Sequence, residues 1–139
     1  MTTNNMKQDI SISMDNFDYL DGIISQVYSL TTFIVANDNH KAMPRTTLAN
    51  LLWTASERIG EALTDCVDMY FGELSGEQLK FEQLLIQAKS VLDALRNSDD
   101  LGGLLGGHLS NVIWLVDGLL EDAIKELGKM STRSDEQAA

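Results

Sequence analysis

The chain has 139 residues, with 21 Asp and Glu against 10 Lys and Arg, which gives a formal net charge of −11. This length suits one domain with a substantial core, and the acidic balance opposes binding to nucleic-acid phosphates or to an anionic membrane surface. Cys66 is the single cysteine, which excludes an intramolecular disulfide and a zinc site built from several cysteines.

The first segment, residues 1–12, is polar and is predicted to be a flexible N-terminal arm. Ile10, Ile12 and Met14 alternate with two serines, so a short extended strand is the alternative to a frayed terminus. The N-terminal sequence contains no apolar stretch of signal-peptide type. The apolar segment Val112–Leu120 is interrupted by an aspartate and is too short to cross a bilayer. We therefore expect a cytoplasmic protein without membrane contact.

Apolar residues at helical spacing predict four amphipathic helices in a domain that covers residues 13–130. The predicted helices are Asp15–Ala36, Thr46–Phe71, Glu77–Arg96 and His108–Gly128. Turn-forming residues separate them, and the polar residues 131–139 are predicted to be a disordered tail. Because short connections make successive helices antiparallel neighbours, the predicted fold is all-α, an antiparallel four-helix bundle.

The two predicted hairpins resemble each other when 61 is added to each position of the first. The shift aligns Gln26, Ser29, Leu48, Asn50, Trp53 and Ala62 with the identical residue types Gln87, Ser90, Leu109, Asn111, Trp114 and Ala123. Leu51, Leu52 and Ile59 align with Val112, Ile113 and Leu120. The match has no gap, which favours a bundle built from two similar helical hairpins. The alternative is that any two amphipathic helices can be slid into partial register.

Motifs for metal or catalytic chemistry are weak in this sequence. It contains no Glu-x-x-His, the motif that di-iron helix bundles use, and His40 and His108 flank different loops. Cys66 lies on a predicted core stripe, where a free cysteine behaves as a small hydrophobe. We therefore expect no metal, no cofactor and no catalytic residue, and we predict that the chain is not an enzyme.

Two tryptophans lie opposite the predicted core. At 100° per residue, Trp53 points roughly 140° from the centre of its apolar stripe, and Trp114 roughly 150° from its own. Tryptophan is costly to leave in water and is enriched at interfaces. Small residues nearby, such as Gly60 and Gly118, would let another helix approach closely. Either the rings anchor an interface, or a skewed bundle packs them internally.

An acidic ridge follows one face of the second predicted helix and consists of Glu57, Glu61, Asp65 and Asp68. Like charges three or four residues apart on a helix repel each other, and each such pair lowers the stability of the helix by a few tenths of a kcal/mol. A row of carboxylates can dock a basic surface, although a plain solvated face is the alternative.

These observations together predict a small acidic protein that binds another protein and has no enzymatic activity. It would be an adaptor, an inhibitor or an immunity-type factor, with a basic partner and a homodimeric state. The predicted partner-binding residues are the two tryptophans and the acidic ridge: Trp53, Trp114, Glu57, Glu61, Asp65 and Asp68. The alternative is a helical bundle that binds a small molecule or acts as a regulator, although no convergent polar groups are evident to orient such a ligand. Direct binding to nucleic acid is not expected.

Overall fold

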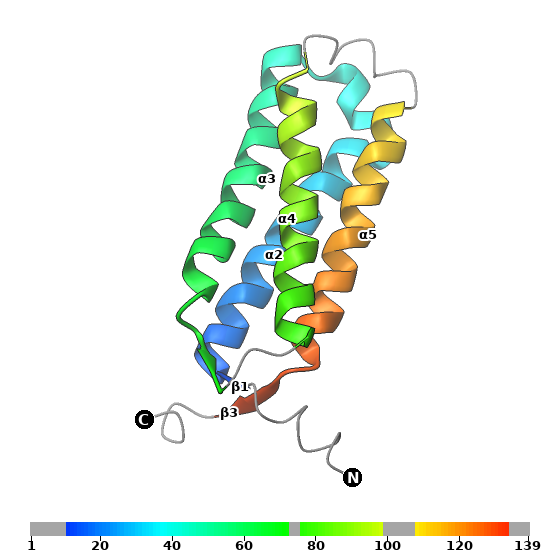
Figure 1. Cartoon of the computed structure of the whole chain (residues 1–139). Helices are drawn as coiled ribbons and strands as arrows, with labels where there is room; N and C mark the ends of the chain where they lie inside the picture. The colour runs from blue at the N-terminus through cyan, green and yellow to red at the C-terminus, as the bar shows by residue number, and fades with distance from the viewer. Residues whose placement is uncertain (1–10, 73–75, 99–107, 134–139) are drawn as a thin grey trace.

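The computed structural model describes residues 11–72, 76–98 and 108–133, which contain four long α-helices. Helices α2 (Met14–Val35), α3 (Arg45–Cys66), α4 (Gly76–Arg96) and α5 (His108–Gly128) lie side by side as a bundle (Figure 1). Each helix packs chiefly on two others, since α2 and α4 each contact both α3 and α5. This arrangement confirms the predicted all-α four-helix bundle and places α3 diagonally opposite α5.

The start of α2 and the connection to α3 follow local rules. Ser13 caps α2, because its side-chain oxygen accepts a hydrogen bond from the backbone N–H of Asn16 at 3.1 Å. After α2 a 3₁₀ segment, η1 (Ala36–Ala42), contains Asn37 and Asp38 at φ values of 53° and 59°. Asn and Asp tolerate this left-handed conformation better than most residues. They end α2 within one residue of the predicted position.

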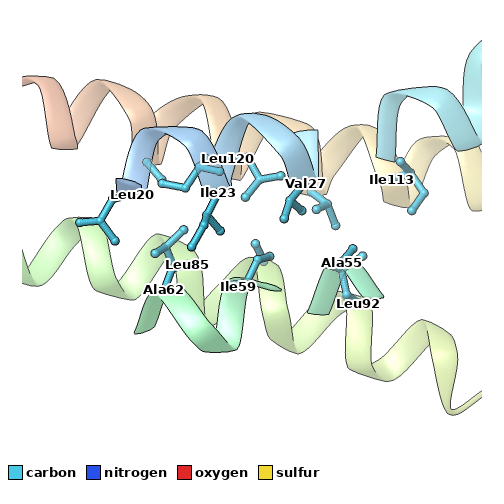
Figure 2. Packing of buried hydrophobic residues seen from close by; sticks show 14 of the residues in the cluster. Leu20, Ile23, Val27, Ala55, Ile59, Ala62, Leu85, Leu92, Ile113 and Leu120 are labelled. Carbon is cyan, nitrogen blue, oxygen red and sulfur yellow. The ribbon is translucent and has the colours of Figure 1, made fainter. Parts of the chain in front are cut away.

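The core runs along the axis between the four helices (Figure 2). Leu20, Ile23 and Val27 of α2 meet Ile59 of α3, Leu85 and Leu92 of α4, and Ile113 and Leu120 of α5. These side chains are almost completely buried. The predicted apolar stripes therefore identify the faces that pack.

The 61-residue repeat is present in the packing as well as in the sequence. Positions related by the shift of 61 are buried in both hairpins. Examples are the pairs Leu20 and Phe81, Ile24 and Leu85, Val27 and Ala88, Leu52 and Ile113, and Ile59 and Leu120. The polar contacts repeat too. Ser56 on α3 donates a hydrogen bond to Asp93 on α4. At the positions equivalent to these two residues, Asp117 on α5 accepts a hydrogen bond from Thr32 on α2, so the contact recurs with donor and acceptor exchanged. The two hairpins thus bury equivalent positions, an approximate internal symmetry in which α3 is equivalent to α5.

A small sheet lies at one end of the bundle (Figure 1). Strand β1 (Ser11–Ser13) is central, pairing antiparallel with β2 (Tyr70–Phe71) and parallel with β3 (Ser131–Arg133). Ile12 is fully buried and joins the hydrophobic core. The alternative of a short N-terminal strand is therefore correct for Ser11 and Ile12, whereas the rest of the predicted arm, residues 1–10, lies outside the described residues.

Two predicted boundaries are wrong for a common reason. The second helix was expected to continue to Phe71, but α3 ends at Cys66 and Tyr70–Phe71 pairs with β1. The disordered tail was expected from Ser131, but Ser131–Arg133 forms β3; residues 134–139 lie outside the described residues. In both places pairing with a distant strand satisfies backbone groups that local sequence patterns leave unassigned.

Candidate binding surface

The indole of Trp53 stands on the outer side of α3, directed away from the core. Its side chain is 50% exposed. Its Nε1–H donates a hydrogen bond to the Glu57 carboxylate at 3.1 Å, one helical turn further along. The guanidinium carbon of Arg96, on α4, lies 5.3 Å from the centre of the ring. Trp53 is therefore exposed and held in place, with a carboxylate on its edge and a cation against it.

A polar network between α3 and α4 fixes Arg96 in that position. Arg96 Nε donates to Asp93 Oδ1 at 3.2 Å, and Lys89 Nζ donates to Asp93 Oδ2 at 3.0 Å. The buried hydroxyl of Ser56 accepts from Lys89 at 3.0 Å and donates to Asp93. Burial acts to raise the pKa of Asp93, but the hydrogen bonds from Ser56, Lys89 and Arg96 outweigh it and lower that pKa. Asp93 is thus a charged anchor for the cation beside Trp53.

The acidic ridge lies on the same side of α3 as Trp53, but its carboxylates are not all free. Glu57 accepts from Trp53, Glu61 accepts from Arg58 at 2.7 Å, and Asp65 accepts from the Tyr19 hydroxyl at 2.5 Å. That last hydrogen bond raises the pKa of the Tyr19 hydroxyl. These contacts order the carboxylates without removing their charge.

The fourth member of the ridge departs from the predicted arrangement. Asp68 is exposed, but it follows the end of α3 and lies in the turn before β2. The prediction that all four carboxylates share one helix is therefore wrong for Asp68, because α3 ends five residues earlier than its apolar pattern indicates.

Two shallow hollows follow the exposed surface of α3. The first has a volume of about 320 Å³ and is lined by Asn50, Trp53, Thr54, Glu57, Arg58 and Glu61. The second has about 350 Å³ and is lined by Glu57, Gly60, Glu61, Thr64 and Asp65. We call this surface, from Asn50 to Asp65, the Trp53 face. It combines an exposed aromatic ring, carboxylates and shallow relief.

Trp114 has the equivalent position on α5, but its surroundings differ. Its side chain is 62% exposed, and the neighbouring Leu115 is 57% exposed. Within the described residues, its ring makes none of the contacts that hold Trp53. Because α3 and α5 are diagonal in the bundle, the structure does not bring the two tryptophans together. Internal packing was the alternative for both rings, and their exposure argues against it.

Cys66 and Ser56 are two buried side chains of nucleophilic type. Burial raises the pKa of the Cys66 thiol, which disfavours the thiolate that a reactive cysteine needs. Ser56 is fully buried, and its hydroxyl is engaged by Asp93 and Lys89. Among the described residues, no three His, Cys, Asp or Glu side chains gather in a way that could hold a metal ion. Of the helices in this part of the chain, none combines the length and the hydropathy needed to span a membrane.

Sequence reasoning found the tryptophans and the carboxylates but missed Arg96 and its anchor Asp93. Both lie on α4, more than thirty residues from Trp53, and no local pattern links them to it. The approximate symmetry also offers no hint, since the position equivalent to Arg96 is Val35. Comparison of the chain with protein-family models, with curated proteins and with solved structures finds no match.

Proposed function

We propose that this chain is a non-enzymatic protein-binding protein, an adaptor, inhibitor or immunity-type factor, that receives a basic partner on the Trp53 face. The observation that carries the proposal is the held, half-exposed indole of Trp53 among the carboxylates of α3. Residues that dominate protein interfaces are enriched in Trp, and a side chain that is already held in one position loses less conformational freedom on binding. We propose further that the chain acts in the cytoplasm, binds no nucleic acid and forms a homodimer.

Charge supports a basic rather than a neutral partner. Glu57, Glu61 and Asp65 are all exposed on α3, with Arg58 as the neighbouring cation. The chain as a whole carries a net charge of −11, so the long-range field has the same sign as the local one. Such a field raises the rate of encounter with a positively charged surface, by about tenfold or more at low salt.

The alternative function, a bundle that holds a small molecule, has less support. Both hollows described above are shallow and open, and they lie outside the bundle. Sites for small molecules are usually enclosed enough to bury most of the ligand. Between the helices, the labelled positions of Figure 2 are filled by apolar side chains in mutual contact.

Affinity capture from a lysate of the source cells tests the proposal if matched variants are compared. Glu57→Gln combined with Glu61→Gln removes two charges from the Trp53 face while keeping oxygens that accept from Trp53 and Arg58. Asp18→Asn combined with Asp21→Asn removes two charges from α2 and serves as the control. Trp53→Ser removes the anchor.

The expected result is a basic protein that the wild type and the α2 control capture but that both Trp53-face variants lose. With the purified partner, we expect the Glu57/Glu61 variant to associate about tenfold more slowly at low salt and equally fast at about 1 M salt, where the Debye length is about 3 Å. Capture that is indifferent to these substitutions, or equal rates at low salt, would reduce the ridge to a solvated surface.

A further inference from the structure

The two tryptophans occupy equivalent positions in the two hairpins, but the residue four positions after each of them differs. Trp53 donates its indole N–H to Glu57, four residues further along α3. The residue equivalent to Glu57 on α5 is Gly118, which offers no acceptor to Trp114. A Cβ placed on Gly118 would have nothing within 4 Å, so the space beside Trp114 is open. Trp114 therefore lacks the side-chain acceptor that Glu57 provides to Trp53, and the space where such a group could lie is open.

The surface around Trp114 also differs in charge. We define the Trp114 face as the exposed outer residues of α5, namely Asn111, Trp114, Leu115, Gly118, Glu121, Asp122 and Lys125. Glu121 and Asp122 against Lys125 give this face a net charge of −1. The Trp53 face carries Glu57, Glu61 and Asp65 against Arg58, a net charge of −2, and Asp68 extends it. A second copy of an acidic chain is repelled less by the Trp114 face than by the Trp53 face.

We propose that the Trp114 face is the homodimer interface, in which α5 of one copy packs antiparallel on α5 of a second copy about Gly118. The homodimer itself is part of the function proposed above, and this inference assigns its surface. In such a pair, Trp114 of each copy lies opposite Asp122 of the other, since both are four residues from Gly118. Lys125 lies one turn beyond Asp122. The second copy thereby brings a carboxylate and a cation to Trp114, as Glu57 and Arg96 do for Trp53.

Packing supports the same pairing. Glycine at the crossing point lets two helix backbones approach closely, and the exposed Trp114 and Leu115 lie beside it. The 21-residue helix α5 presents a strip about 30 Å long and about 10 Å wide. Two such strips bury about 600 Å² in total, well below the roughly 1,200–2,000 Å² of standard interfaces, so we expect weak self-association with a dissociation constant of about tens to hundreds of micromolar. Trp53 remains free for the basic partner, because α3 lies diagonally opposite α5.

Sedimentation velocity over a wide range of concentrations, with the full chain, tests this assignment. Gly118→Glu places on α5 the carboxylate that α3 has at the equivalent position, fills the open space and adds a charge at the crossing point. Gly22→Glu is the matched control, since Gly22 lies within α2 and a Cβ there also meets nothing within 4 Å. Both variants gain helix propensity, so both should remain folded.

We expect Gly118→Glu and Trp114→Ser each to weaken self-association by about tenfold or more, and Gly22→Glu and Trp53→Ser to leave it unchanged. Raising the salt from about 0.05 to about 0.5 M should strengthen the dimer or leave it unchanged, because screening reduces repulsion between two acidic copies. Binding of the basic partner should respond to salt with the opposite sign.

The possible failures point to different conclusions. A chain that stays monomeric at high micromolar concentration would overturn the homodimer and this interface together, and would leave binding of a basic partner to its own test. A dimer that Gly118→Glu does not weaken, or that Trp53→Ser weakens equally, would overturn the assignment to α5 alone.

Discussion

Asp93 offers a quantitative test of the network that positions Trp53. Asp93→Asn keeps the size of the side chain but removes the charge that Lys89 and Arg96 contact at 3.0 and 3.2 Å. Hydrogen bonds to a charged group contribute about 1.5–3 kcal/mol when they are well buried. Here the three side chains are 27–32% exposed, and solvent screens the pairs toward the range of about 0.2–1 kcal/mol found for surface pairs.

From these limits we expect Asp93→Asn to lower the free energy of unfolding at neutral pH by about 1–2 kcal/mol. For a chain of this size that corresponds to a fall in the melting temperature of about 3–7 °C. Urea unfolding followed by circular dichroism measures the first quantity, and a thermal scan measures the second. Asp18→Asn, which neutralises an exposed carboxylate on α2, is the control and should change neither.

The pH dependence of this loss provides the decisive check. The folded structure lowers the pKa of Asp93 below its ordinary value of 3.8, so its contribution is fully present above that value. It is lost as the pH falls through the lowered pKa, and the difference between wild type and Asp93→Asn should then disappear. An equal difference at pH 7 and at strongly acidic pH would refute the electrostatic explanation.

The same substitution should loosen Trp53, because Arg96 loses its anchor. In a Trp114→Phe background, the fluorescence reports Trp53 alone, and quenching by acrylamide should become more efficient in Asp93→Asn. If quenching is unchanged, Asp93 stabilises the contact between α3 and α4 without fixing the position of the Trp53 indole.

The remaining predictions concern the core and a second carboxylate. Ile59→Ala should lower the free energy of unfolding, measured by urea titration, by about 3–4 kcal/mol, because the side chain is fully buried. Trp53→Ser should lower it by no more than about 1 kcal/mol, because this side chain is half exposed. Similar losses for the two variants would mean that Trp53 belongs to the core. Burial raises the pKa of Asp117 above 3.8 despite hydrogen bonds from Thr31 and Thr32, so its ionisation destabilises the fold as the pH rises through that window. Asp117→Asn should therefore gain stability relative to wild type between acidic and neutral pH, and urea midpoints at several pH values that run parallel for the two proteins would contradict this.

The contrast between Asp93 and Asp117 shows what neighbours contribute. Each aspartate accepts hydrogen bonds from a hydroxyl on the adjacent helix. Asp93 also has two cations, whereas the charged residue that acts on Asp117 is Glu121. Equivalent contacts of the repeat therefore accompany opposite pKa shifts, because Asp117 is more deeply buried, while the hydrogen bonds from Ser56, Lys89 and Arg96 outweigh the partial burial of Asp93.

Local patterns in the sequence determined the helices and their buried faces. The spacing of Leu20, Ile23 and Val27 predicts the face of α2 that packs, because a helix must bury one apolar stripe. The same reasoning placed Trp53 and Trp114 outside the core, and their exposure agrees with it. The offset of 61 residues predicted two similar hairpins, since equal patterns on two helix pairs bury equal faces.

Contacts between distant segments were decided only by the tertiary structure. Tyr70–Phe71 continues an apolar pattern that fits a helix, yet it pairs with β1, because strand pairing depends on segments sixty residues away. Arg96 reaches Trp53 only because α3 and α4 pack with a particular register and Asp93 holds the guanidinium there. A periodic pattern records which face of a helix is buried but not which helix lies next to it, so the sequence alone located the tryptophans while the packing decided what surrounds each one.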